Sequence, residues 1–163
     1  MSVSLEVIHA FLSRARSMMW AAVGEVSSVE PVVPGTKFYQ LVEGDWCYTD
    51  QFAGYVRFSG IEFVSYRGEA VWSMSYYGGI LPGSEDIVDE VHAFLGRMLL
   101  QHVSDTRLFS KWARGEAEGK WMYRYLLSEL GPAHATELIY LRQAEGSMPV
   151  YHCHFLGGLI VAG

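Results

Sequence analysis

Two glutamates on apolar stretches are the residues of this chain that point most directly to chemistry. Alternation along a strand-like segment places Glu62 on the same side as Phe58 and Val64. Glu137 likewise shares one side of a later segment with Ile139. A carboxylate on an apolar face is costly unless a partner pairs with it or donates a hydrogen bond. If the two acids converge, they can hold a cationic or hydrogen-bond-donating small molecule.

Four aromatic residues accompany these acids at matching positions. We expect them to line one pocket with the two carboxylates, so that the predicted ligand-binding residues are Glu62, Glu137, Trp46, Trp121, Tyr48 and Tyr123. In the structural alternative, each glutamate stabilises its own part of the backbone or pairs with an arginine, such as Arg57, Arg124 or Arg142. The sequence does not identify the small molecule.

Two histidines form the second candidate site. His152 and His154 stand two residues apart in a predicted strand, so both side chains point to one face. Imidazoles at this spacing can share a metal ion, with His134 or Glu137 as a third ligand. The alternative is a polar, solvated face of the sheet. Cys153 points to the opposite face, out of reach of either histidine as a base, and we expect it to be a packing residue.

Glycine pairs end two of the predicted strands. Gly78-Gly79 and Gly157-Gly158 lack the spacing of a phosphate-binding loop and close a strand instead of opening a helix. They are typical of a β-bulge or of a place where another backbone comes close.

The composition indicates a single folded domain spanning residues 1–163. Half of the residues are hydrophobic and 14% are aromatic, which is enough for a sizeable core, and only 18% are charged. The net charge of −6 and the scattered lysines and arginines argue against nucleic-acid binding. No apolar run approaches the length of a membrane span. We expect a cytoplasmic protein with reduced cysteines, no cofactor and no membrane partner.

Hydrophobic periodicity predicts an α+β fold. A helix is expected over 4–22 and a second one after Ser84, a plausible N-cap residue, up to His102. Residues 104–119 are weakly patterned. The strands are predicted at 37–42, 46–52, 55–66, 70–80, 121–127, 134–141 and 150–161.

The second half of the chain repeats the first. Four residues of the first half recur 75 positions later as Gly119, Trp121, Tyr123 and Glu137, and the offset grows to 79 after a second turn that we expect at 143–149. This pattern indicates two helix-plus-strands repeats, at about 4–82 and 84–163, which pack as two helices on a mostly antiparallel sheet. The repeat also predicts a strand at 121–127, where composition alone is compatible with a helix.

Three segments resemble a family of uncharacterised bacterial domains. They are Phe58-x-Gly60-x-Glu62, Trp72-Ser-Met-Ser-Tyr-Tyr-Gly78 and Val150-Tyr-His-Cys-His-Phe-Leu-Gly-Gly158. The resemblance covers nearly the whole chain. It implies a domain that occurs alone or behind an Xre-type helix-turn-helix, and hence a sensing or effector role, although we expect no such DNA-binding module within these 163 residues. It implies no catalytic residue.

Three functions are compatible with these features. The first is a non-enzymatic ligand-binding or sensing domain with the pocket between its two repeats, acting on a separate protein partner. The second is a metal- or carboxylate-dependent hydrolase that uses Glu62, Glu137, His152 and His154. The third is a structural or interaction module, for which the 8 Phe, 5 Trp and 10 Tyr predict a homodimer.

Overall fold

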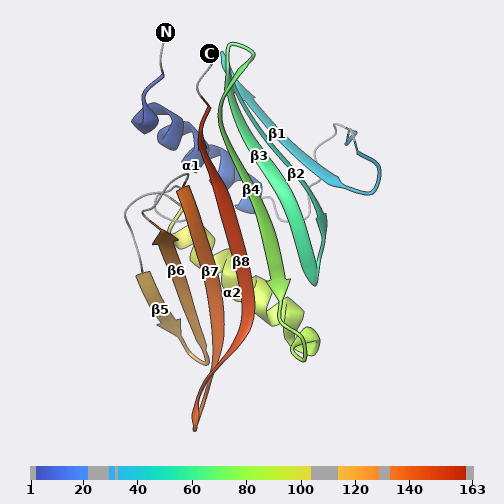
Figure 1. Cartoon of the computed structure of the whole chain (residues 1–163), viewed down its shortest axis with the longest axis vertical. Helices are drawn as coiled ribbons and strands as arrows, with labels where there is room; N and C mark the ends of the chain where they lie inside the picture. Colours follow the sequence, from blue (N-terminus) through green and yellow to red (C-terminus); the bar gives the residue numbers. More distant parts are fainter. Residues whose placement is uncertain (1–2, 22–29, 32, 104–113, 129–132, 161–163) are drawn as a thin grey trace.

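A long antiparallel sheet with helices on one face forms the fold in the computed structural model (Figure 1). The structure describes residues 3–21, 30–31, 33–103, 114–128 and 133–160. Within these ranges the sheet has eight strands in the order β1-β2-β3-β4-β8-β7-β6-β5. The predicted α+β class, with two helices packed on an antiparallel sheet, is therefore confirmed.

The helices and strands agree closely with the periodicity of the sequence. The helices are α1 (Leu5–Ala21), the short 3-10 helix η1 (Glu85–Ile87) and α2 (Val88–Gln101). The strands of the first half are β1 (Lys37–Glu43), β2 (Trp46–Gly54), β3 (Arg57–Tyr66) and β4 (Glu69–Ile80). Those of the second half are β5 (Arg114–Glu118), β6 (Trp121–Ser128), β7 (Ala133–Gln143) and β8 (Gly146–Leu159).

The sheet joins the two halves of the chain through one pair of strands. Each half is a meander of four neighbouring strands, and β4 of the first half pairs antiparallel with β8 of the second. Tyr76 stands opposite Phe155 at the middle of this pair. Figure 1 shows α1 and α2 behind the strands, on the same side of the sheet. The other side of the sheet has no helix on it among the described residues.

Three predictions of local structure need correction. β5 occupies part of the weakly patterned segment 104–119, where no strand was expected. The second turn is shorter than predicted, because β7 extends to Gln143 and β8 begins at Gly146. Ser84 precedes η1 but its side chain makes no capping hydrogen bond; the nearby Gly83 amide donates to the Glu85 carboxylate at 2.8 Å.

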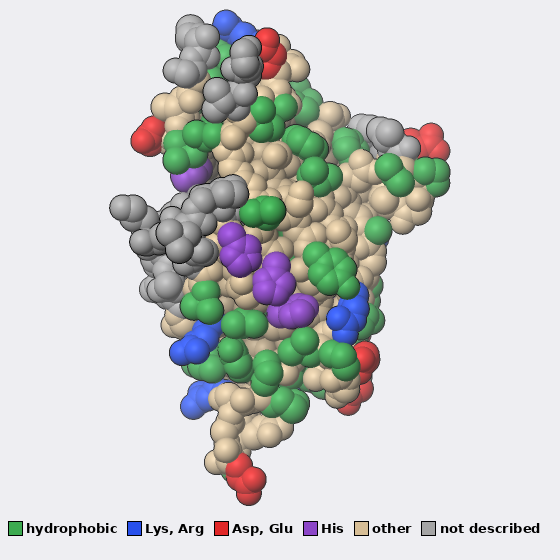
Figure 2. Space-filling model, viewed as in Figure 1, with side chains coloured by type: hydrophobic (Ala, Val, Ile, Leu, Met, Phe, Trp, Pro, Cys, Tyr) green, Lys and Arg blue, Asp and Glu red, His purple; other side chains and the backbone are tan. Residues whose placement is uncertain are grey.

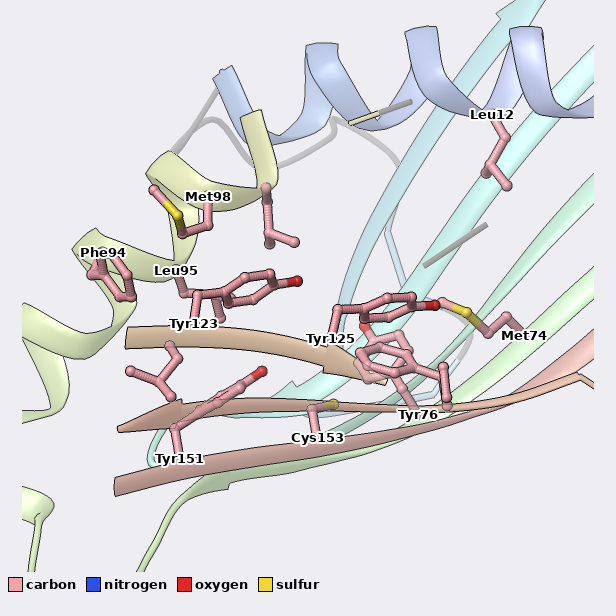
Figure 3. Packing of buried hydrophobic residues seen from close by; sticks show 14 of the residues in the cluster. Leu12, Met74, Tyr76, Phe94, Leu95, Met98, Tyr123, Tyr125, Tyr151 and Cys153 are labelled. Carbon is pink, nitrogen blue, oxygen red and sulfur yellow. The ribbon is translucent and has the colours of Figure 1, made fainter. Parts of the chain in front are cut away.

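The core lies between the helices and the sheet. Phe94, Leu95 and Met98 of α2 point onto the aromatic side chains of β6 and β8, and Leu12 of α1 points to the first half (Figure 3). All four are buried. Residues three or four apart on a helix share one face, so the amphipathic pattern brings this stripe onto the sheet.

Two glycines allow the central strands to approach closely. A Cβ atom on Gly78 would lie 2.3 Å from the carbonyl oxygen of His152, and one on Gly157 would lie 2.1 Å from that of Ser73. Both neighbours are backbone atoms that cannot turn aside. The prediction that these glycines mark a close backbone approach is confirmed.

No described helix is long and apolar enough to cross a membrane. Cys47 and Cys153 are both free thiols, and Cys153 is buried, as expected for a packing residue.

Candidate functional site

The inner face of the sheet, beneath the helices, holds the two glutamates. Glu62 on β3 is 1% exposed and Glu137 on β7 is fully buried. Alternation along each strand puts both carboxylates on the helix-covered side, in agreement with their places in the sequence pattern.

Glu62 pairs with an arginine of α1. The Nε and Nη2 atoms of Arg16 donate to one oxygen of Glu62 at 2.9 and 2.7 Å, and Arg16 is also fully buried. The guanidinium lies 5.5 Å from the Trp72 ring, a cation–π distance. The partner of Glu62 is thus none of the three arginines considered from the sequence. Removing either member would leave a buried charge without its partner.

Glu137 is held by tyrosines of its own half. Tyr123 on β6 donates to one carboxylate oxygen at 2.8 Å, and Tyr151 on β8 donates to the other at 2.9 Å. Figure 3 shows these two phenols pointing in the same direction beneath α2, from β6 and β8, the strands on either side of β7.

The two glutamates are not brought together. β4 and β8 lie between β3 and β7, so three strand spacings, or about 14 Å, separate Glu62 from Glu137 across the sheet. Glu62 aligns with Met74 of β4 and Glu137 with Gly78, and this offset of four residues adds about 13 Å along the strands. The hydrogen bonds described for each acid come from its own half. The contacts therefore match the structural alternative for the carboxylates more closely than the shared pocket.

The four aromatic residues are also distributed between the halves. Trp46 packs on Phe11 of α1 with 5.3 Å between ring centroids, and Trp121 stacks on Phe94 of α2 at 6.1 Å. Both tryptophans thus anchor a helix to its strands. Tyr48 is fully buried, and burial together with the charge of Glu62 raises its pKa well above the usual value.

A further buried carboxylate was missed in the sequence. Asp50 on β2 is 3% exposed and stands opposite Glu62 in the ladder, and Tyr76 donates to it at 2.8 Å. Arg16 was missed as well. Its spacing of four from Leu12 and eight from Ile8, both buried, was a signal that it lies on the inner stripe of α1.

The opposite surface of the sheet is uncovered among the described residues, and we call it the open face. Its central side chains come from β3, β4, β7 and β8: Ser59, Ile61, Phe63, Ser73, Ser75, Tyr77, His134, Thr136, Leu138, His152, His154 and Leu156. Tyr77 is 55% exposed, Leu156 53% and Ile61 37%. Figure 2 looks onto this face and shows histidines near its middle, hydrophobic side chains around them and most charged side chains near the outline.

Fixed charges are almost absent from the open face. None of its twelve defining residues is Asp, Glu, Lys or Arg. Arg57 and Arg124 stand at the two ends of the cross-strand row that runs through His152 and Leu138. An antiparallel sheet in contact with water normally alternates apolar and polar side chains. Of the twelve residues, five are aliphatic or aromatic and the other seven are serine, threonine or histidine.

The three histidines lie together on this face. The ring centroids of His152 and His154 are 5.2 Å apart, and those of His134 and His154 are 6.1 Å apart with nearly parallel planes. Nδ1 of His154 is 3.1 Å from the Thr136 hydroxyl. Within the described residues, no group of three or more histidine, cysteine or acidic side chains is arranged to hold a metal ion.

The residues of the hydrolase and metal-site hypotheses lie on opposite sides of the sheet. His152 and His154 point to the open face, whereas Glu62, Glu137 and Cys153 point to the helices. The four residues of the hydrolase hypothesis are therefore not brought together, and Glu137 cannot join the histidines as a metal ligand. His134 does lie beside them.

Comparisons with known proteins give a family but no activity. No curated protein and no solved structure matches the chain. A family described as a domain of unknown function (DUF5680) matches residues 50–160, from the middle of β2 to the end of β8. The matched segment includes the whole central sheet and the open face. The chain therefore belongs to the DUF5680 family of domains of unknown function.

Proposed function

We propose that this chain is a non-enzymatic interaction domain that uses the open face to bind a second copy of itself. The observation that carries this proposal is the nearly charge-free, partly apolar surface at the centre of an uncovered sheet. Exposed apolar patches of this kind mark interaction sites in soluble proteins, and the cores of protein interfaces are depleted in charged residues.

The contacts on the inner face support a structural role for that face and a binding role for the open face. Arg16 neutralises Glu62, and two phenols donate to Glu137, so these acids have the contacts of structural groups. The residues proposed for hydrolysis stand on opposite sides of the sheet. A binding function at the open face requires none of them to react.

A second copy suits the open face for two reasons. The twelve central side chains of the open face include no charged group, and Arg57 and Arg124 flank them in one cross-strand row, so apolar contact with a similar face is the best complement. Its size is also sufficient. Eight strands spaced about 4.8 Å apart and roughly 30 Å long present on the order of 1,000 Å², more than the roughly 800 Å² per partner of a standard interface.

An internal duplication accounts for the symmetric strand order, and we include it in the proposal. Arg14 pairs with Glu43 in the first half, and Arg97 pairs with Glu118 in the second. Glu118 follows Glu43 by the offset of 75 residues, and Arg97 follows Arg14 by 83 residues, the spacing that also relates Phe11-Leu12 of α1 to Phe94-Leu95 of α2. The two half-sheets meet at Tyr76 and Phe155 in the strand ladder, which such a duplication would place on a local twofold axis.

Cytoplasmic location is the other part of the proposal. Cys47 and Cys153 are free thiols, as is usual in a reducing compartment.

Light scattering after size-exclusion chromatography tests the dimer. Wild type is expected near twice the 18.3 kDa of one chain, whereas Leu156→Lys and Tyr77→Lys are expected near one chain mass, because a lysine would be desolvated in the interface. Leu100→Lys, at an exposed position of α2, is the matched control, and this variant should remain dimeric. A wild type that stays monomeric at micromolar protein concentrations would contradict self-association through the open face.

A small-molecule site beneath the helices is the second candidate. It is favoured by the gathering of Asp50, Glu62, Tyr48 and Tyr76 on the inner face of the first half. A ligand that binds only the folded state raises thermal stability. Glu62→Gln should abolish such a shift while the variant remains folded. If no compound of a cationic library shifts the melting temperature, this candidate fails.

A further inference from the structure

The histidine pair at the centre of the open face is arranged as one half of a metal site. Two imidazoles that bind one tetrahedral zinc ion, each through a nitrogen about 2.1 Å away, have ring centroids roughly 5 Å apart. The centroids of His152 and His154 are 5.2 Å apart, and their planes are inclined by 60°. The ring separation thus needs no movement of the strand.

Polar contacts of these rings leave nitrogens available. The Thr136 hydroxyl contacts Nδ1 of His154 at 3.1 Å, which orients this ring and leaves its Nε2 atom for a ligand. Nε2 of His152 is buried and has no hydrogen-bond partner among the described residues. A buried polar atom without a partner is unfavourable, and a bound ion would remove this penalty.

One copy of the chain supplies only two ligands. The His134 ring is inclined by only 9° to that of His154, so the two rings stack, and their in-plane nitrogen lone pairs do not converge on an ion between them. This agrees with the absence of a three-ligand group in the described residues. A tetrahedral ion needs two further ligands from elsewhere.

A second copy can supply them. His154 stands opposite Tyr77, next to the central Tyr76 and Phe155 pair, so it lies near the middle of the sheet. Sheets that pack face to face are about 10 Å apart. A histidine side chain extends roughly half that distance, so those of two facing copies reach a common plane when the sheets are stacked centre over centre.

We propose that His152 and His154 of two copies together bind one divalent transition metal ion, with zinc as the best fit to four nitrogen ligands, and that the ion stabilises the dimer. This inference rests on the proposed function, because the site is incomplete in a single chain. It adds a ligand class and a means of regulation to the open face: self-association would depend on metal availability.

Sedimentation velocity with and without Zn²⁺ tests the coupling. Zinc is expected to lower the dimer dissociation constant about 10- to 100-fold, the usual range for coupled binding, with one ion bound per two chains. His152→Ala and His154→Ala should lose both the ion and the zinc effect. His92→Ala, which removes a histidine of α2 on the other side of the sheet, is the matched control and should retain both.

Cobalt(II) gives an independent readout. Four nitrogen ligands should produce the strong visible absorption of tetrahedral cobalt, at half an equivalent per chain. A dimer that forms equally well with and without zinc and binds no ion would overturn the metal site and leave the proposed dimer intact. One ion bound per monomeric chain would overturn both.

Discussion

The two faces of the sheet differ in the polarity of their side chains and in how far water reaches them. The inner face contains Arg16, Glu62 and Glu137, which are charged or polar and almost completely buried, and each has partners within the chain. The open face contains Ile61 and Leu156, which are apolar and exposed. Polar groups are thus satisfied where water is excluded, and apolar groups are left uncovered where water has access.

This difference indicates which face performs the function. A carboxylate on an apolar face of a predicted strand suggests a functional site, because burying its charge costs free energy. Here the contacts of the two glutamates with other residues of the chain account for their burial. Exposed isoleucine and leucine are common singly, and their grouping on a sheet face with few fixed charges supports the proposed partner. Substitutions on the inner face should therefore change stability, and substitutions on the open face should change association.

The largest effect is expected from breaking the buried ion pair. Glu62→Ala or Arg16→Ala leaves one buried charge alone, so the free energy of unfolding should fall by about 3–5 kcal/mol in urea denaturation. The double variant Arg16→Met with Glu62→Leu removes both charges and should recover much of this loss. Arg14→Ala, which breaks the exposed pair with Glu43, is the control and should cost less than about 1 kcal/mol. A loss below 1 kcal/mol for Glu62→Ala would contradict a structural role.

Removing one phenol hydroxyl from the second half should have an intermediate effect. Tyr151→Phe keeps the ring but deprives Glu137 of one of its donors, so the free energy of unfolding should fall by about 1–3 kcal/mol. Tyr123→Phe should behave similarly, since it removes the donor to the other oxygen. Tyr77→Phe removes an exposed hydroxyl on the open face and serves as control. Equal stability of all three variants would show that the hydroxyl contacts to Glu137 carry no energy.

A smaller effect is expected from pH through His92 of α2. Burial is the main cause of its lowered pKa, partly offset by the charge of Asp89. The unfolded chain therefore binds the proton more readily than the folded one. This histidine should leave stability unchanged above its ordinary pKa of about 6.5 and reduce it as the pH falls toward the lower folded-state value.

Urea denaturation between pH 7.5 and pH 5 measures this contribution as the difference between wild type and His92→Gln. The wild type should lose more stability on acidification, by less than about 1.4 kcal/mol per pH unit. A steeper loss in His92→Gln would have the wrong sign for a group with a lowered pKa.

Alternation and helical periodicity predicted the helices and six of the strands, and the internal repeat decided in favour of a strand at 121–127. They failed for β5, Arg114–Glu118, whose residues are small or charged. β5 is an edge strand that pairs with β6, and Glu116 contacts His102 at the end of α2. Such a segment is specified by distant partners and by the polar character of sheet edges, so its own sequence carries little strand signal.

The candidate site could be predicted only in part. The apolar neighbours of Glu62 and Glu137 correctly indicated their common, buried face. Their separation depends on strand order, because β4 and β8 pair with each other and lie between them. Local sequence contains no measure of this pairing. Arg16 was overlooked as a partner of Glu62, although its spacing from Ile8 and Leu12 put it on the buried stripe of α1.

The central claim is that two copies meet through their open faces, and a distance between copies tests it most directly. In a Cys47→Ser background, a spin label at Ser75→Cys reports from the middle of the open face, and one at Ala93→Cys reports from the exposed side of α2. Pulsed electron resonance should give a label separation below about 25 Å at position 75, since stacked sheets are about 10 Å apart, and a much longer one at position 93. The account would be contradicted by an absence of dipolar coupling at position 75, or by the shorter distance occurring at position 93.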